Sequence, residues 1–277
     1  MEAAFKDKIC VITGAASGLG LAMIHRLLAA GAVVIGGDVS RKNLEEAQQE
    51  LTEYADQAAL YPVDVREPDQ VKELVAHAVE RGRLDYLFNN AGIYQMAPFE
   101  EITREEWQAM IDINVWGVIN GMQAAIPIML EQGGGHIVNT NSQAGFFPMA
   151  LNTSYCLTKY AVLGLSQAAY YEYADRNIVV SAICPSDFQT NLVRNSSVQG
   201  VDLNGPVMSS EAYRMLPTAD DVARAVLEGV LKKQRIIQPM DNLDILGDEL
   251  IYQTKENTIM DRWLAETAGQ RLAAWRK

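Results

Sequence analysis

The sequence predicts a single α/β domain, built on a doubly wound parallel sheet of about seven strands with helices on both faces. Short apolar runs alternate with longer helix-period stretches, the runs suit strands buried on both faces, and no linker or repeat interrupts the series. The expected strands are 9–13, 32–37, 58–63, 84–89, 135–140, 178–183 and 235–239. The expected helical stretches are 18–30, 41–54, 68–81, 104–131 and 154–175. Residues 1–277 are therefore expected to form one domain.

Composition narrows the classes of partner. The chain of 277 residues is 49% hydrophobic and 21% charged, with a formal net charge of −12, which disfavours nucleic acid and anionic membrane surfaces. The three cysteines and three histidines are scattered without metal-ligand spacing. No secretory signal and no run of 18 apolar residues is evident. We expect a cytoplasmic protein with reduced thiols, no metal and a small-molecule substrate.

Two segments depart from the regular alternation. Residues 186–217 are polar and punctuated by Gly, Pro and Ser, and they are long for a loop in a compact domain. Loops of that length are typically lids or binding loops, so a substrate loop is expected there. Residues 241–277 look like a C-terminal helical extension with Trp263 and Trp275 at apolar positions. The sequence leaves open whether this extension packs on its own subunit or on a neighbour.

A glycine-rich turn stands between the first strand and the first helix. Gly14, Gly18 and Gly20 occur where a chain can turn tightly and let its backbone approach a pyrophosphate. The following helix would then offer free N–H groups and a partial positive charge. The alternative is a plain strand–helix turn with packing glycines. The position of the turn favours a dinucleotide site.

The second strand ends in an acid. Asp38 follows Gly14 by 24 residues, where a carboxylate can accept hydrogen bonds from the adenosine ribose hydroxyls and repel a 2′-phosphate. Neither Ser17 nor Val39 supplies a cation for such a phosphate, and Arg41 more plausibly opens the next helix. NAD is therefore the predicted cofactor. Asp38 could instead simply open a loop.

Further motifs follow in a recognisable order. The chain reads TGAASGLG at 13–20, NNAG at 89–92 and DINVWGVING around Asn114, and Ser142 precedes Tyr155 by 13 residues with Lys159 four residues later. Over residues 7–239 this series resembles the short-chain dehydrogenase/reductase family, which has a Rossmann-like fold. Several motifs in register are more specific than any one of them.

The resemblance implies roles for four side chains. Tyr155 would be the general base in alcohol oxidation and the acid in reduction, and Lys159 would favour its phenolate and bind the nicotinamide ribose. Ser142 would hydrogen-bond the substrate oxygen, and Asn114 would hold a water in the proton relay. The pKa of Tyr155 is thus expected below the ~10 of a free tyrosine.

The same resemblance implies further cofactor contacts. The turn ICPSDFQT resembles the family's Pro-Gly-x-x-x-Thr, but Ser186 replaces the glycine, at some cost if that position needs a positive φ. Asp64 could instead be a simple strand-end residue. The cofactor-binding set that follows is Gly14, Ser17, Gly18, Leu19, Gly20, Asp38, Asp64, Val65, Asn90, Ala91, Gly92, Tyr155, Lys159, Pro185, Phe188 and Thr190.

Apolar residues around the catalytic pair suggest the substrate class. The family lines its substrate cleft with the segment between the catalytic serine and tyrosine and with the mobile loop. The candidates are Phe146, Phe147, Met149, Leu151, Leu192 and Val193, with Val207 and Met208 further along the loop. An apolar cleft suits a hydrophobic or aromatic secondary alcohol or ketone. These residues could instead pack the core or subunit contacts.

The sequence thus predicts an NAD-dependent oxidoreductase that interconverts a secondary alcohol and its ketone. Two alternatives stay open: an NADH-binding redox sensor on the same fold, and an NAD-retaining epimerase. The intact catalytic set disfavours the first, and the TGxxxGxG form of the loop disfavours the second. Family resemblance also suggests a homotetramer or dimer. The exact substrate, its stereochemistry and the physiological direction lie beyond the sequence.

Overall fold

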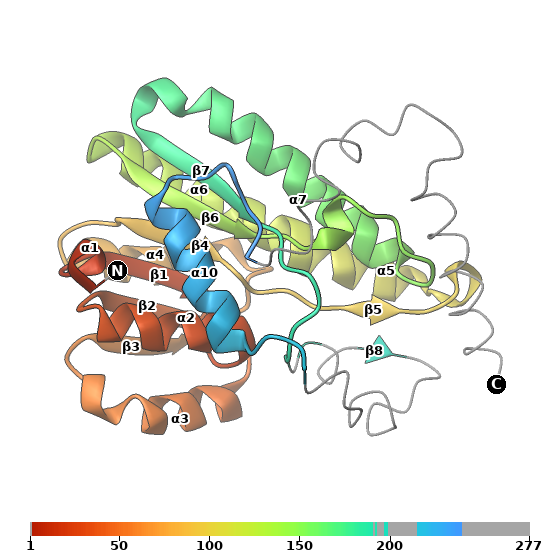
Figure 1. The fold of residues 1–277 in the computed structure, drawn as a ribbon, viewed down its shortest axis with the longest axis horizontal. Coiled ribbons are helices and arrows are strands. Elements are labelled where there is room, and N and C mark those ends of the chain that lie inside the picture. The colour runs from red at the N-terminus through yellow and green to blue at the C-terminus, as the bar shows by residue number, and fades with distance from the viewer. Residues whose placement is uncertain (1, 191, 193–196, 199–214, 240–277) are drawn as a thin grey trace.

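A seven-stranded parallel sheet forms the centre of the computed structural model, which describes residues 2–190, 192, 197–198 and 215–239 (Figure 1). The strand order is β3-β2-β1-β4-β6-β7-β9, and every adjacent pair is parallel. The strands are β1 (Ile9–Thr13), β2 (Val33–Asp38), β3 (Ala58–Pro62), β4 (Tyr86–Asn89), β6 (Gly135–Thr140), β7 (Ile178–Ile183) and β9 (Ile236–Ile237). The predicted fold class is confirmed.

Helices cover both faces of this sheet, because alternate residues of each strand point to opposite sides. In β1, Cys10 and Ile12 pack towards α2 (Gly18–Ala29) and α10 (Ala219–Leu231), whereas Ile9 and Val11 pack towards the other face. That second face carries α4 (Pro68–Glu80), α6 (Gly117–Glu131) and α7 (Thr153–Glu172). The remaining elements are α1 (Glu2–Phe5), α3 (Arg41–Glu50), α5 (Arg104–Ile111), β5 (Gln95–Met96) and β8 (Ser197–Val198). All three cysteines are buried, and none of them forms a disulfide.

The strand order reverses between β1 and β4. In open parallel sheets, ligands bind at the carboxyl ends of the strands beside such a reversal. The glycine loop follows β1 there, and the NNAG segment begins in the last residue of β4. The topology therefore brings the two motifs to one edge of the sheet.

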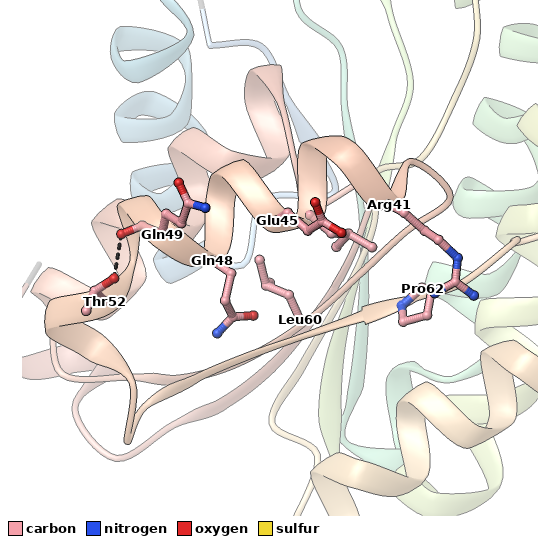
Figure 2. Close-up of a pocket in the computed structure, with 8 residues that line it drawn as sticks. Arg41, Glu45, Gln48, Gln49, Thr52, Leu60 and Pro62 are labelled. Carbon is pink, nitrogen blue, oxygen red and sulfur yellow. Dashed lines mark hydrogen bonds between the residues drawn. The ribbon is translucent and has the colours of Figure 1, made fainter.

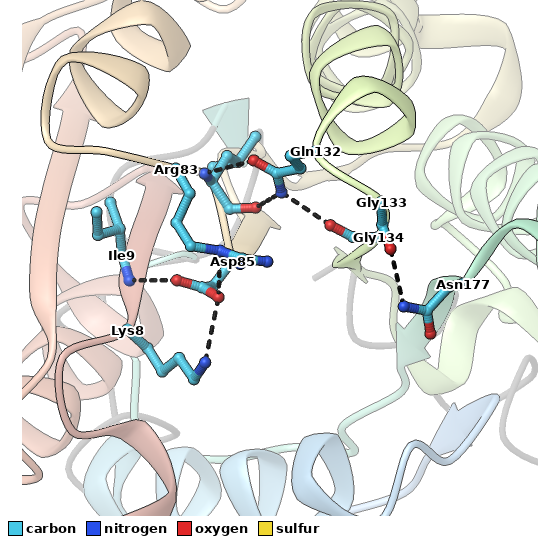
Figure 3. A network of polar contacts seen from close by, with 9 residues as sticks. Lys8, Ile9, Arg83, Asp85, Gln132, Gly133, Gly134 and Asn177 are labelled. Carbon is cyan, nitrogen blue, oxygen red and sulfur yellow. Dashed lines mark hydrogen bonds and ion pairs between the residues drawn. The ribbon is translucent and has the colours of Figure 1, made fainter.

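A cluster of polar contacts stabilises the opposite end of the strands (Figure 3). The carboxylate of Asp85, 7% exposed, accepts a hydrogen bond from the backbone N–H of Ile9 and pairs with Lys8 and Arg83. Gln132 bonds both the N–H and the carbonyl of Leu84. These contacts join the starts of β1 and β4 to the end of α6, far from the strand ends that carry the motifs.

The helical stretch Arg104–Glu131 is long and apolar enough to cross a membrane by length and composition alone. Half of its most apolar window is buried inside the protein, and α6 packs against the sheet and α4. Here the apolar face covers a protein core. The stretch predicted as one helix is interrupted by a π turn at Asp112–Trp116.

Two predicted segments lie wholly or partly outside the described residues. The C-terminal extension 241–277 is outside them, as is most of the loop 186–217, including Val193, Val207 and Met208. Pro185, Phe188, Thr190 and Leu192 are described.

Candidate active site

The glycine loop has the shape of a close-approach turn. Gly14 and Gly18 adopt φ of 65° and 54°, the left-handed region that favours glycine. A Cβ on Gly20 would lie 2.0 Å from the carbonyl oxygen of Gly14, so no side chain fits at that helix position. Ser17 precedes α2 without a capping hydrogen bond from its side chain, which leaves the first-turn N–H groups to an anion. The loop therefore fits the pyrophosphate of a dinucleotide.

Asn90 and Thr13 hold this loop against β4. The Asn90 amide donates to the carbonyls of Thr13 and Gly14, each at 3.1 Å, and the Thr13 hydroxyl accepts from the N–H groups of Asn90 and Ala91. Sequence reasoning placed Asn90 along the cofactor but did not single out Thr13. The position of Thr13 at the end of the first strand, directly before the glycine loop, could have indicated that its hydroxyl supports the loop.

Asp38 is oriented by backbone donors on both sides. Its two carboxylate oxygens accept from the N–H groups of Ala16 and Ser40, at 3.0 and 2.9 Å. One donor belongs to the glycine loop and the other to the start of α3, so the carboxylate is fixed beside the loop. Because each oxygen has a further lone pair, the group can still accept from two hydroxyls. This geometry fits a ribose.

Asp64 and Val65 differ in how they meet the predicted adenine region. Arg66 hydrogen-bonds both carboxylate oxygens of Asp64, and these bonds lower the pKa of the carboxyl. Val65 is 7% exposed, and its carbonyl accepts from Asn120. Both residues thus make structural contacts of their own here, and their contact with the adenine remains a prediction.

Three of the four predicted catalytic side chains meet beside the first turns of α7. Ser142 lies close enough to Tyr155 to favour its phenolate, and the Lys159 ammonium lies 5.4 Å from the centroid of the Tyr155 ring. Lys159 donates to the carbonyl of Thr140, the last residue of β6, at 3.0 Å. A Cβ on Gly92 would lie 3.8 Å from the Lys159 nitrogen, so the NNAG segment borders the same space. The motifs in register predicted that these groups lie together, and the structure brings them together; their catalytic roles remain a prediction.

Asn114 sits in the π turn and is fully engaged. Its side-chain oxygen accepts from the N–H of Ile93 at 2.8 Å, and its nitrogen donates to the Ile93 carbonyl at 2.9 Å and to Thr158. A π turn inside a helix frequently marks a functional site. The side chain here fixes the segment that follows NNAG, while the predicted water-holding role remains a prediction.

Burial dominates the acid–base properties of the pair. It raises the pKa of Tyr155, although the contact with Ser142 acts in the opposite direction. It lowers the pKa of Lys159 from 10.5 to about 8. The lowered tyrosine pKa expected from the sequence is therefore not found in this structure, because desolvation of the phenolate outweighs the favourable contacts. At neutral pH the lysine is still mostly protonated.

The predicted substrate residues fall into different places. Met149 packs with Tyr155 and Tyr94 in one small apolar cluster. Phe146 packs in another, against Leu163 and Cys184. Phe147 and Leu151 are each 6% exposed, and Leu192 is half-buried. Met149 is thus the member with a described contact to the catalytic tyrosine, while Phe146 contributes to core packing.

The turn after β7 approaches the glycine loop. A Cβ on Gly18 would lie 3.4 Å from the Thr190 hydroxyl, and Phe188 packs against the core beside α2. The Pro185 carbonyl accepts from Gln143. Ser186 does not adopt a positive φ, so the serine that replaces the family glycine is unstrained.

A separate hollow of about 500 Å³ lies outside this site (Figure 2). It runs along the edge strand, between α3 and β3, with Arg41 and Pro62 at one end and Thr52 at the other. None of the catalytic side chains lines it.

Comparison with known proteins agrees with this arrangement. The family model described as short chain dehydrogenase matches residues 8–199. The chain belongs to the short-chain dehydrogenase family. It is 39% identical over 186 residues to a 3-oxoacyl-[acyl-carrier-protein] reductase of Thermotoga maritima. The aligned region covers 67% of this chain and 76% of the reductase.

Two further members of the family are similar to this chain, one in sequence and one in structure. The chain is 36% identical over 197 residues to 3beta-hydroxysteroid dehydrogenase 2 of Eggerthella lenta, covering 69% and 76% of the two chains. A Burkholderia phymatum short-chain dehydrogenase/reductase solved with NAD superposes with a TM-score of 0.76 at 26% identity, over 86% of this chain and 91% of that one. Solved relatives include both NAD and NADP complexes. This member is accordingly an oxidoreductase acting on CH–OH groups with a nicotinamide cofactor.

Proposed function

We propose that this dehydrogenase uses NAD to interconvert a hydrophobic secondary alcohol and its ketone. The observation that carries the proposal is the contact of Ser142 with Tyr155, with Lys159 5.4 Å from the same ring and Gly92 beside the Lys159 ammonium. These groups form the buried end of the candidate site, and the glycine loop forms its other end.

Each side chain then has a defined task in oxidation. Tyr155 takes the hydroxyl proton, and Ser142 donates to the substrate oxygen as its charge changes. The Lys159 ammonium stabilises the phenolate that Tyr155 must form, which offsets part of the desolvation of that anion. NAD held by the glycine loop would supply the hydride acceptor, so that alcohol and NAD would give ketone, NADH and a proton.

The preference for NAD rests on Asp38. Its carboxylate is held by the amides of Ala16 and Ser40 at the edge of the glycine loop, where a 2′-phosphate would meet a negative charge. Arg41, the nearest cation that follows Asp38 in the chain, lines the outer hollow beside Pro62.

Assembly and location follow the same resemblance. We include in the proposal a homo-oligomer, a cytoplasmic location, and no nucleic-acid or membrane partner. Large apolar side chains exposed along the helical face of α5 to α7 support self-association, because such side chains favour contact with another apolar surface. They are Trp116, Leu157 and Tyr160.

A panel of apolar secondary alcohols and polyols tests the proposed function. NADH formation from NAD is followed by absorbance, with NADP as a parallel cofactor. Turnover of apolar alcohols with NAD is expected. Turnover confined to polyols would overturn the substrate class, and turnover confined to NADP would overturn the cofactor assignment. NADH binding without any turnover would favour the sensor, and NAD that copurifies without exchanging would favour the epimerase.

A further inference from the structure

A short segment after the NNAG motif is fastened at both ends to the catalytic elements. Asn114 bonds both the N–H and the carbonyl of Ile93, and the N–H of Ala97 donates to the carbonyl of Leu151 at 2.9 Å. Between them, Gln95 accepts from the Ser154 hydroxyl at 2.8 Å in a buried contact. The segment 93–97 therefore moves with the catalytic turn and with the start of α7.

Tyr94 lies in the middle of this segment, edge-on to the catalytic tyrosine. The rings of Tyr94 and Tyr155 are 4.9 Å apart at an interplanar angle of 72°, a favourable geometry for two aromatic rings. Ile93, Met110 and Met149 pack in the same cluster. On this side the catalytic ring thus borders an apolar cluster that includes the ring of Tyr94.

That hydroxyl is held by a buried amide. It donates to Oδ1 of Asn152 at 3.1 Å and accepts from Nδ2 at 2.9 Å, and Asn152 is 1% exposed. Asn152 is also the residue that precedes α7, three positions before Tyr155. The amide thereby fixes the angle of the Tyr94 ring relative to the catalytic phenol. It also engages the polar end of Tyr94, so the ring rather than the hydroxyl would meet a ligand.

We infer that Tyr94 is a specificity-determining residue whose fixed ring forms one wall of the substrate site, selecting secondary alcohols and ketones in which a ring adjoins the reacting carbon. The inference rests on the proposed function and names its substrate class. A rigid ring packs against an immobile aromatic wall with little loss of internal freedom. An open chain must give up several rotamers to make the same contact.

Three methyl ketones of equal carbon number separate ring from chain. They are acetophenone, cyclohexyl methyl ketone and 2-octanone, measured for affinity towards the NADH-loaded protein by titration calorimetry. The wild type is expected to bind the two ring ketones at least about fivefold more tightly than the open chain, the size of one aromatic contact. Equal affinity for all three would overturn the inference.

Two variants then assign the preference to Tyr94. Tyr94→Leu is expected to abolish the ring preference, and Tyr94→Phe to retain most of it because the ring remains. Phe99→Leu is a matched control in the next turn of the chain, since Phe99 is 65% exposed and packs on Trp107. An unchanged ring preference in Tyr94→Leu, or an equal loss in Phe99→Leu, would contradict the assignment.

Separate readouts distinguish this inference from the proposed function. Thermal unfolding of each variant reports whether the fold is kept, and Tyr94→Phe provides the measurement if Tyr94→Leu does not fold. NADH affinity is determined first. A wild type that does not bind NADH would overturn the proposed function. In that case the affinities of the three ketones, measured without NADH, would still decide whether Tyr94 selects rings over open chains.

Discussion

The Lys159 ammonium lies 5.4 Å from the ring centroid of Tyr155 and donates to the Thr140 carbonyl at the end of β6. One hydrogen bond thus fixes the cation between the catalytic helix and the sheet edge. Burial lowers the pKa of Lys159 to about 8 while raising that of Tyr155. Tyr155 and Lys159 are therefore both buried. At the low dielectric of a protein interior, the charge of Lys159 interacts more strongly with a Tyr155 phenolate than it would in water.

Replacing Lys159 by methionine is expected to reduce kcat/KM for alcohol oxidation by about 10²-fold or more, the usual scale for a lost acid–base partner. Without the ammonium, the contact with Ser142 alone is left to offset the cost of a buried phenolate on Tyr155. Lys8→Met is a control, because Lys8 belongs to the polar cluster at the far end of the sheet. An oxidation rate that is the same in Lys159→Met and Lys8→Met would contradict this role.

Changing Asp38 to asparagine should shift the cofactor preference towards NADP. The neutral amide no longer repels a 2′-phosphate, and it loses the second acceptor that the ribose uses. The ratio of kcat/KM for NAD over NADP is expected to fall by about tenfold or more, equivalent to ~1.4 kcal/mol. Asp69→Asn is the control, because Asp69 is an exposed residue in the first turn of α4. It should leave the ratio of kcat/KM for NAD over NADP unchanged. A ratio unaffected by Asp38→Asn would show that another group selects the cofactor.

Gly20→Ala tests the close approach in the glycine loop. The new Cβ would lie 2.0 Å from the Gly14 carbonyl oxygen, so the loop must shift and cofactor affinity is expected to fall by at least about tenfold. Gly164→Ala is the matched control, because it is also helical and has open space around the added methyl. The control should be stabilised by about 0.5–1 kcal/mol. Undiminished NADH affinity in Gly20→Ala would contradict the pyrophosphate assignment.

His136 predicts a pH-dependent stability. Its Nε2 lies 2.8 Å from the Ser181 hydroxyl, which donates to the Gln234 carbonyl, so Nε2 carries a proton and donates to Ser181. Burial lowers its pKa from 6.5 to about 3. Between those values the unfolded chain binds a proton and the folded protein does not. Stability should therefore fall with decreasing pH by about 1.4 kcal/mol per pH unit from this group.

The variant His136→Gln isolates that contribution. Its free energy of unfolding, measured by urea titration from pH 7 to pH 4, should decline less steeply than that of the wild type, since all other titrating groups are shared. Parallel curves for the two proteins would contradict the depressed pKa of His136.

The alternation of apolar runs predicted all seven strands of the main sheet, because strands buried on both faces must be apolar throughout. It predicted the stretch 104–131 as one helix but not the π turn at Asp112–Trp116, since nothing in the periodicity reveals an inserted turn. The helix Ala219–Leu231 was not among the expected helical stretches, although it covers the sheet beside α2.

The proximity of Tyr155 and Lys159 could be predicted because fixed spacing on one helix places them on one face. Their catalytic roles came from the resemblance to the family and stay a prediction. Contacts between distant parts of the chain left no such signal. Tyr94 meets Asn152 across 58 positions, and Thr13 meets Asn90 across 77. The sequence predicted a lowered pKa for Tyr155, whereas burial raises it in the structure. Burial depends on how several elements pack around the residue, which the sequence does not reveal.

The most direct test of the account compares the wild type with Tyr155→Phe for NADH formation from the best alcohol of the panel. Tyr171→Phe serves as the control, being an exposed tyrosine on the same helix. We predict that Tyr155→Phe binds NADH as tightly as the wild type and loses about 10²-fold or more in kcat, while Tyr171→Phe keeps its rate. Turnover by Tyr155→Phe at the wild-type rate would contradict the assignment of Tyr155 as the proton-transfer group.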